Sequence, residues 1–217
     1  LLKKFNNRLD IPGMTFPREL DILSNIASLV PEGGKILEIG SCFGRSAHAL
    51  YTGKKETVKL TCLDLWGDTI PFPENSYHGS KELLNDAINI SFERQNSRYG
   101  FEYILGSEII NDIEIIQDSS SNLKDFNFDL VFIDGDHNYS SVSTDINNFV
   151  FNSNTLILGD DANQSNWDVI KAIWDNKRNR TLIVPSGQDV KFFALIPPNG
   201  YWVDHSNSIL EILRYEF

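Results

Sequence analysis

The chain has few cysteines and no long apolar run. Two of its 217 residues are cysteines, Cys42 and Cys62, and both fall in apolar, strand-like segments. Two such thiols do not form a disulfide framework, so we expect buried, reduced cysteines and a cytoplasmic location. The apolar stretches are far shorter than a bilayer span requires. The sequence therefore predicts no membrane-spanning helix.

Basic residues are also scarce. Nineteen lysines and arginines stand against 30 aspartates and glutamates, which gives a formal net charge of −11. Binding to a nucleic-acid backbone or to an anionic membrane needs a basic patch. We therefore expect neither partner, and we expect a small molecule to be the ligand instead. The excess of acid also suits a site that collects a divalent cation, while the sequence leaves homo-oligomer formation open.

Several familiar catalytic motifs are missing. The sequence has no GxSxG, no GxxxxGK[ST] and no cysteine–histidine cluster with zinc spacing. These absences argue against a hydrolase nucleophile elbow, a P-loop and a structural zinc site.

Apolar runs alternate with helical segments, which is typical of an α/β fold with a parallel sheet. We predict a Rossmann-like, doubly wound sheet of seven strands, mostly parallel with an antiparallel edge strand. The expected strands are 35–39, 59–63, 102–105, 129–133, 155–158, 181–184 and 191–196. The expected helices are 17–30, 45–51, 81–94, 140–150 and 167–179.

A length of 217 residues suits one domain, 1–217, with its core at 17–196. Residues 66–99 interrupt the strand–helix alternation, and their first part is rich in proline and aromatic residues. A long insertion of this kind at the carboxyl edge of a sheet is more often functional than decorative. We expect it to cover the ligand or to shape an acceptor pocket. The tail, 197–217, packs either on its own domain or on a second subunit.

Residues 36–46, ILEIGSCFGRS, are the most informative part of the sequence. An apolar strand that carries one acid, Glu38, breaks into a turn bounded by Gly40 and Gly44, and a helix-compatible run follows. This arrangement brings backbone N–H groups to the carboxyl end of a parallel sheet, where nucleotide-like ligands bind. The spacing is not GxGxxG, which disfavours a pyrophosphate. An acid just before the first glycine suits a cationic ligand, such as the amino group of S-adenosylmethionine (SAM).

Two further strand ends carry groups suited to an adenosine. Asp64 closes the second expected strand, twenty residues after the glycine turn, where an acid hydrogen-bonds both hydroxyls of a ribose. Leu65 and Trp66 would then lie close to the adenosine. Ser107 and Glu108 follow the third expected strand, where polar side chains meet an adenine edge, although Gly-Ser is also an ordinary loop sequence.

Carboxylates gather after the fourth and fifth expected strands. Asp134 follows the run DLVFI, and Asp160 and Asp161 follow LILG. Because neighbouring parallel strands end at the same edge of a sheet, we expect these three carboxylates to converge. Converging carboxylates repel one another unless they are protonated or bind a cation. Oxygen ligands favour a hard ion, so the sequence predicts a site for Mg²⁺ or Ca²⁺.

Asp136 and His137 are the candidate catalytic bases. A base must reach the acceptor hydroxyl directly or through one water. Asp136 lies beyond Gly135, so it can face an acceptor while Asp134 faces the metal. His137 has the more suitable intrinsic pKa, but it would equally orient Asp136 or cap the next helix. We favour Asp136.

Together these residues resemble class I SAM-dependent methyltransferases. More narrowly they are similar to small metal-dependent O-methyltransferases, including the macrocin-type and other sugar O-methyltransferases. The signature of that group is an EIGxxxGxS turn, an acid after the second strand and a FIDGDHxY run. These correspond here to residues 38–46, to Asp64 and to residues 132–139.

The resemblance implies a role for each candidate residue. It implies that SAM is the cofactor and that its methionine end is bound by Glu38, Gly40, Ser41, Gly44 and Ser46. It implies that Asp64 binds the ribose and that Ser107 or Glu108 meets the adenine. In the sugar-modifying members the metal ligands correspond to Asp134, Asp160 and Asp161, and the base corresponds to Asp136.

We therefore expect an enzyme that methylates a hydroxyl of a small polyhydroxylated acceptor, such as a sugar, with the help of a divalent metal. The sulfonium of SAM would point toward Asp134, so this residue also belongs to the expected cofactor site. Three alternatives stay open: metal-independent methyl transfer, a nucleotide-binding oxidoreductase on a similar fold, and a non-catalytic SAM-fold subunit. The sparse glycines after Gly40 disfavour the oxidoreductase, and the intact acids at both strand ends disfavour lost catalysis.

Overall fold

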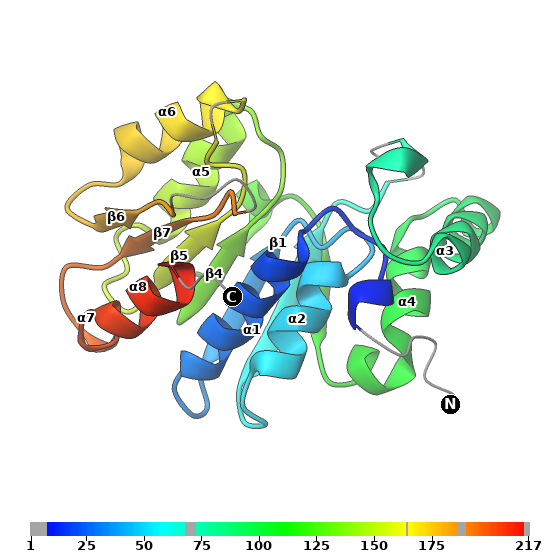
Figure 1. The fold of residues 1–217 in the computed structure, drawn as a ribbon, viewed down its shortest axis with the longest axis horizontal. Helices are drawn as coiled ribbons and strands as arrows, with labels where there is room; N and C mark the ends of the chain where they lie inside the picture. Colours follow the sequence, from blue (N-terminus) through cyan, green and yellow to red (C-terminus); the bar gives the residue numbers. More distant parts are fainter. Residues whose placement is uncertain (1–7, 68–72, 164, 186–189, 215–217) are drawn as a thin grey trace.

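The structure, a computed structural model, describes residues 8–67, 73–163, 165–185 and 190–214. Among these residues it contains the strands β1 Lys35–Ile39, β2 Lys59–Asp64, β3 Glu114–Gln117, β4 Leu130–Ile133, β5 Leu156–Gly159, β6 Thr181–Ile183 and β7 Phe193–Ile196. They form one sheet in the order β3-β2-β1-β4-β5-β7-β6 (Figure 1). The strands are parallel except β7, which runs antiparallel to both β5 and β6. The predicted doubly wound, mostly parallel sheet is confirmed, with the antiparallel strand next to the outermost one.

Helices cover both faces of the sheet (Figure 1). One face is covered by α1 Pro17–Leu29, α2 Arg45–Gly53, α4 Arg98–Ile110 and α8 Ser206–Arg214, whose buried residues share one core cluster with the strands. The other face is covered by α5 Tyr139–Phe149 and α6 Trp167–Asn176. The helix α3 Lys81–Arg94 packs against α4, and the short α7 Tyr201–Asp204 precedes α8. Single turns of 3₁₀ helix lie at Arg8–Asp10, Glu74–Ser76 and Ser120–Asn122.

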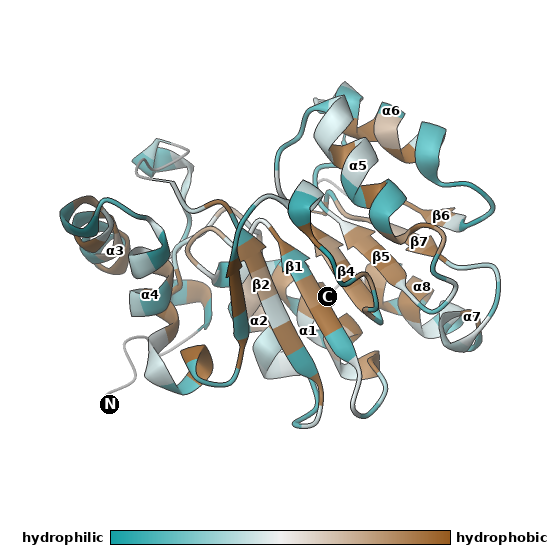
Figure 2. Cartoon of the chain, turned by 180° about the vertical axis from the view of Figure 1, so that it is seen from behind, coloured by the Kyte–Doolittle hydropathy of each residue, from teal (hydrophilic) through white to brown (hydrophobic). Residues whose placement is uncertain are grey.

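The central strands are apolar on both sides because helices bury both faces. Figure 2 shows β1, β4 and β5 as hydrophobic over most of their length. Within β1, Ile36 belongs to the core under α1 and α2, while its neighbour Leu37 belongs to the core under α5 and α6. This alternation follows from the two-residue period of a strand. The near-continuous apolar runs are therefore what made these strands visible in the sequence.

The prediction for the third strand is wrong. Residues 102–105 lie inside α4, and the third strand is β3, about ten residues later. The apolar run around Ile104 belongs to a helix because Phe101, Ile104 and Leu105 recur at helical spacing and are buried on one side. The strand β3 was missed because it is short, lies at the edge of the sheet and is only half-buried.

The described part of the tail packs on its own domain. Trp202 is fully buried, and its indole Nε1 donates to the carbonyl oxygens of Asp129 (2.8 Å) and Asn154 (3.1 Å). Ile209 and Leu213 of α8 join the core beneath α1. Of the two placements expected for the tail, on its own domain or on a second subunit, residues 197–214 therefore take the first. Residues 215–217, like 68–72 of the predicted insertion and most of the turn predicted between β6 and β7, lie outside the described residues.

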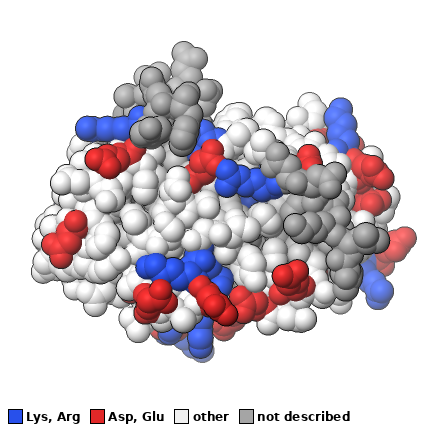
Figure 3. Space-filling view, turned by 60° about the horizontal axis from the view of Figure 1, so that its bottom comes forward, with Lys and Arg blue, Asp and Glu red and all other residues white. Residues whose placement is uncertain are grey.

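Among the described residues, no helix combines the length and the hydropathy that crossing a bilayer requires. On the face shown in Figure 3, acidic and basic side chains are interspersed between wide uncharged areas.

Candidate active site

A cavity of about 530 Å³ opens at the carboxyl ends of β1, β2 and β4. Its walls are the turn after β1, the loops after β2, β3 and β4, and a stretch of the N-terminal segment. The chain turns to opposite sides of β1 to form β2 and β4, so the cavity lies at the switch point where open α/β sheets bind ligands. Several predicted residues line it: Gly40, Ser41, Ser46, Asp64, Leu65, Trp66, Asp134, Asp136 and His137.

The glycine turn forms the floor of the cavity. Gly40 has φ 94°, and a Cβ atom at this position would lie 2.0 Å from the carbonyl oxygen of Asp134. The backbones after β1 and β4 therefore touch at a point where no side chain fits. Gly44, also at positive φ, leads directly into α2, whose first residues Arg45 and Ser46 line the cavity.

Glu38 lies beneath this turn rather than in the described cavity wall. The side chain is fully buried, and its Oε2 accepts a hydrogen bond of 2.5 Å from Ser41 Oγ. Its other oxygen, Oε1, is buried without a hydrogen-bond partner among the described residues. Burial raises the pKa of Glu38 to about 7, although the hydrogen bond from Ser41 acts in the opposite direction. Ser41, which lines the cavity, therefore lies between Glu38 and the cavity.

Asp64 ties the loop after β2 to the glycine turn. Its Oδ2 accepts from the backbone N–H of Cys42 (2.8 Å), and its Oδ1 accepts from the backbone N–H of Trp66 (3.0 Å). The indole Nε1 of Trp66 donates in return to the carbonyl oxygen of Cys42 (3.0 Å). Trp66 is buried, whereas Leu65 is mostly exposed at the rim. A ligand in the cavity meets a carboxylate whose position is fixed by both loops.

The structure does not bring Ser107 and Glu108 together with the other candidates, because both are exposed on α4 and neither of these described residues lines the cavity. The loop after the real third strand takes their place and contributes Asp118, Ser119 and Ser120. The signal was the polar run DSSS after EIIQ, and it was hidden by the misplaced strand.

The N-terminal segment forms a wall that the sequence did not predict. Gly13, Met14 and Thr15 line the cavity. They are held by Arg45, a buried residue of α2 whose guanidinium donates to the carbonyl oxygens of Thr15 (2.9 Å) and Leu9 (3.0 Å). The same segment pairs with the insertion, since Gly13 and His78 exchange two backbone hydrogen bonds.

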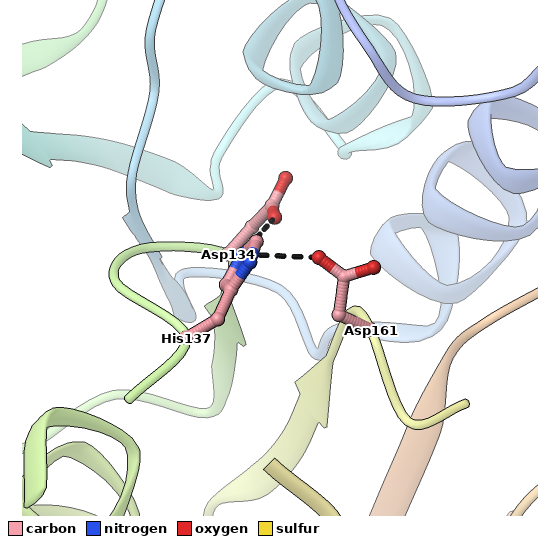
Figure 4. A group of neighbouring side chains, drawn as sticks. All are labelled: Asp134, His137 and Asp161. Atoms are coloured by element: carbon pink, nitrogen blue, oxygen red, sulfur yellow. Dashed lines mark ion pairs between the residues drawn. The ribbon is translucent and has the colours of Figure 1, made fainter. Parts of the chain in front are cut away.

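Asp134, His137 and Asp161 converge beside the cavity (Figure 4). One ligand atom of each lies within 4.8 Å of the others. The Nε2 of His137 lies 3.0 Å from Oδ2 of Asp161 and 3.9 Å from Oδ1 of Asp134. Asp134 and Asp161 raise the pKa of His137, while burial and the charges of neighbouring carboxylates raise that of Asp134. Two of the three predicted metal ligands are therefore together, with an imidazole between them.

Asp160, the third predicted ligand, lies next to this group but is not part of it. Its Oδ1 accepts from the backbone N–H of Asp161 (2.6 Å), and its Oδ2 lies 3.7 Å from the ammonium of Lys191. The backbone turns sharply at Asp161, which has φ 61°. Among the described residues, the group that could hold a metal ion therefore contains His137 and not Asp160.

Lys191 also contacts this cluster, and the sequence did not predict it. Its Nζ lies 2.8 Å from Oδ1 of Asp161. Burial alone would lower the pKa of Lys191, but the carboxylates of Asp160 and Asp161 raise it above its ordinary value. No local pattern in the sequence marks this residue, because it comes from the segment that enters β7.

Asp136 lies on the cavity wall and also holds the start of α5. Its carboxylate accepts from Ser141 Oγ (2.9 Å), from the backbone N–H of Asn138 (3.4 Å) and from the side-chain amide of Asn138. These bonds fix the orientation of Asp136 beside His137. Both candidate bases therefore reach the cavity.

The cluster of Asp134, His137 and Asp161 has a composition that suits a divalent cation. Two carboxylates and an imidazole converge at a partly buried position with a third carboxylate, Asp160, next to them. Carboxylates are the preferred ligands of Mg²⁺ and Ca²⁺, and an imidazole extends the set toward transition ions such as Mn²⁺. The donor types fit a metal, although they are not the oxygen-only set that the sequence predicted.

Comparisons with known proteins bear on this site. A family model described as a methyltransferase domain matches residues 37–162, which run from β1 to the segment after β5. No curated protein sequence matches the chain.

Among solved structures, a protein from Corynebacterium glutamicum has a TM-score of 0.56 at 12% identity, over 87% of this chain and 84% of that one. A putative O-methyltransferase from Klebsiella pneumoniae has a TM-score of 0.52 at 17% identity, over 83% and 80%. The cofactor-bound protein Rv0187 from MTB has a TM-score of 0.50 at 17% identity, over 84% and 81%. At such identities the likeness concerns the fold.

Proposed function

The chain belongs to the family of methyltransferase domains, and from this premise we propose that it transfers a methyl group from SAM to a hydroxyl of a small polyhydroxylated acceptor such as a sugar. One observation carries the proposal. The cavity that suits the methyl donor shares two wall residues, Asp134 and His137, with the acidic cluster that suits a hydroxylated acceptor. Donor and acceptor would therefore meet at the end of β4.

The part of the cavity between the glycine turn and the loops after β2 and β3 has groups suited to the ribose, the adenine and the methionine end of SAM. Asp64 would accept hydrogen bonds from the ribose hydroxyls, and the polar loop of Asp118 and Ser119 would meet the adenine. The methionine end would lie over the glycine turn, where Ser41 and the buried, incompletely paired carboxyl of Glu38 favour an ammonium. A cationic ligand there would also offset the cost of burying that carboxylate.

For the acceptor half, the proposal includes a divalent cation, Mg²⁺ or Ca²⁺ by the sequence prediction. Asp134 and Asp161 would hold it, with His137 as the third ligand. When bound, such an ion lowers the pKa of an acceptor hydroxyl and offsets the charge of the developing alkoxide.

The chain's own residues would position the reactants and accept the proton. Asp136, fixed by Asn138 and Ser141, would take the proton of the acceptor hydroxyl as its oxygen attacks the methyl carbon in line. The new C–O bond forms as the C–S bond breaks, and the sulfur keeps the electron pair as S-adenosylhomocysteine (SAH). Because no covalent intermediate is needed, positioning supplies much of the rate enhancement.

The test combines transfer and binding. We would measure label transfer from methyl-labelled SAM to a panel of sugars, polyols and phenols, and SAH affinity by calorimetry. Asp136→Asn should lose about 10²-fold or more in transfer rate while keeping SAH affinity, because proton transfer contributes on that scale. Asp64→Asn should lose SAH affinity, and Asp125→Asn, an exposed surface control, should change neither.

Two results would contradict the proposal, one for the methyl acceptor and one for the methyl donor. If SAH binds but no hydroxylated acceptor is labelled, the assignment of the acceptor is wrong. If NAD binds in place of SAH, the assignment of the donor is wrong and the oxidoreductase alternative gains support.

A further inference from the structure

A lysine ammonium lies directly against the acidic cluster. Lys191 Nζ is 2.8 Å from Oδ1 of Asp161 and 3.7 Å from Oδ2 of Asp160. Lys191 is absent from the described walls of the cavity, so it contacts the cluster from outside that cavity. Its role in methyl transfer would therefore be exerted through Asp161 rather than through contact with SAM.

The position of Lys191 is fixed by its backbone as well as its side chain. Its N–H donates to Oε1 of Glu19 (3.0 Å), and its carbonyl oxygen accepts from the N–H of Ala162 (2.7 Å). Glu19 is itself fully buried, and its other oxygen accepts from the N–H of Phe16 (2.8 Å). The side chain of Lys191 is 26% exposed and extends over the ring of Phe16. The ammonium is thus held in place, unlike that of an ordinary surface lysine.

The two oxygens of Asp161 are shared between two cationic partners. Oδ1 is paired with Lys191, and Oδ2 faces His137 within the group that could hold a metal. A divalent ion bound by Oδ2 would therefore share this carboxylate with the ammonium. Two like charges on one carboxylate repel each other across a few ångströms, and partial burial leaves that repulsion weakly screened.

We propose that Lys191 is a built-in counter-cation that holds the acidic cluster together without metal and lowers its affinity for a divalent ion. This inference rests on the metal component of the proposed function. The ammonium neutralises part of the charge of Asp160 and Asp161, so the cluster does not depend on a metal for its assembly. The same charge makes the metal bind weakly and exchange readily.

The test is the affinity of the full chain for Mn²⁺, without SAM or acceptor, measured by calorimetry and by the paramagnetic resonance of free Mn²⁺. Lys191→Met should bind Mn²⁺ about tenfold more tightly, because a repelling unit charge close to the site is removed. Lys191→Arg, which keeps the charge, should stay near the wild-type affinity. Lys171→Met is the matched control, because it removes an equal charge from an exposed ion pair with Asp175 on α6 and should leave the affinity unchanged.

A second measurement separates repulsion from general damage. Without metal, Lys191→Met should melt at a lower temperature than the wild type, and saturating Mn²⁺ should raise its melting temperature by more than it raises that of the wild type. If Lys191→Met does not fold, Lys191→Gln serves in both measurements. Asp161→Asn should remove Mn²⁺ binding from the wild type and from the lysine variants alike.

The outcomes distinguish this inference from the proposed function. Unchanged or weaker Mn²⁺ affinity in Lys191→Met overturns the counter-cation role. Absence of Mn²⁺ binding in both the wild type and Lys191→Met also overturns it, while the methyltransferase assignment stands as long as SAH binds and methyl transfer proceeds. Absence of SAH binding contradicts the proposed function and leaves the Mn²⁺ comparison as it is.

Discussion

Replacing Glu38 by glutamine should change how the stability of the chain depends on pH. Glu38 is fully buried beneath the glycine turn, and burial raises its pKa from 4.5 to about 7. The folded chain therefore binds this proton more tightly than the unfolded chain does. The favourable contribution is complete below pH 4.5 and is lost as the pH rises through about 7. Glutamine has no such proton, so the variant should not lose this stability.

The expected magnitude follows from the size of the shift. A rise from 4.5 to about 7, at 1.36 kcal/mol for each pKa unit, corresponds to about 3 kcal/mol. Relative to the wild type, Glu38→Gln should therefore gain about 3 kcal/mol of unfolding free energy between pH 4.5 and pH 8. The gain is a difference between two pH values, so it is independent of any constant cost of losing the hydrogen bond from Ser41.

Urea unfolding followed by tryptophan fluorescence measures this difference at a series of pH values. Glu108→Gln is the control, because this residue is exposed on α4 and its replacement should give a difference that is flat with pH. If the free-energy difference between Glu38→Gln and wild type varies by less than about 1 kcal/mol across that range, Glu38 is not desolvated as described and the reasoning fails.

Three further outcomes follow from the structure. Gly40→Ala should lower the free energy of unfolding by about 3 kcal/mol or more, because the alanine would combine a positive φ with a clash against the backbone of Asp134. Unchanged stability in thermal unfolding would show that the two turns do not touch. Trp202→Ala should lower the free energy of unfolding in urea by about 3–5 kcal/mol, because a fully buried indole is lost. A decrease below about 1 kcal/mol would mean that the tail does not pack on the domain. Chelation by EDTA should stop methyl transfer while the SAH affinity measured by calorimetry stays the same, since the cluster lies beside the proposed donor site. Transfer at full rate in EDTA would show that the reaction needs no metal.

The sequence revealed the features that depend on local pattern. The central strands were predictable because continuous apolar runs mark strands that are buried on both faces, and the glycine turn and Asp64 followed from their spacing. The edge strand β3 was not predictable in the same way, since its half-exposed residues carry little signal. Because it was missed, the loop that contributes Asp118 and Ser119 to the cavity wall was not among the candidates.

Within the acidic cluster, the sequence indicated which strand ends meet but not which side chains face one another. Asp161, at positive φ, contacts both His137 and Lys191, whereas Asp160 contacts Lys191 and the backbone N–H of Asp161. Lys191 lies in the segment that precedes β7, and its backbone N–H donates to Glu19 in the first turn of α1. Contacts between such distant segments arise only from tertiary packing, so no local motif announces them.

The hydrogen bonds from Arg45 to the N-terminal segment limit where the chain can be truncated or joined to another domain. The match to the family model begins at residue 37, yet residues 13–15 form part of the cavity wall. Thr15 in this wall is held by the guanidinium of Arg45 in α2. A domain exchange that starts at residue 37 would leave the buried Arg45 without these carbonyl acceptors and would remove one wall of the cavity. A unit that keeps this cavity wall therefore starts well before residue 37.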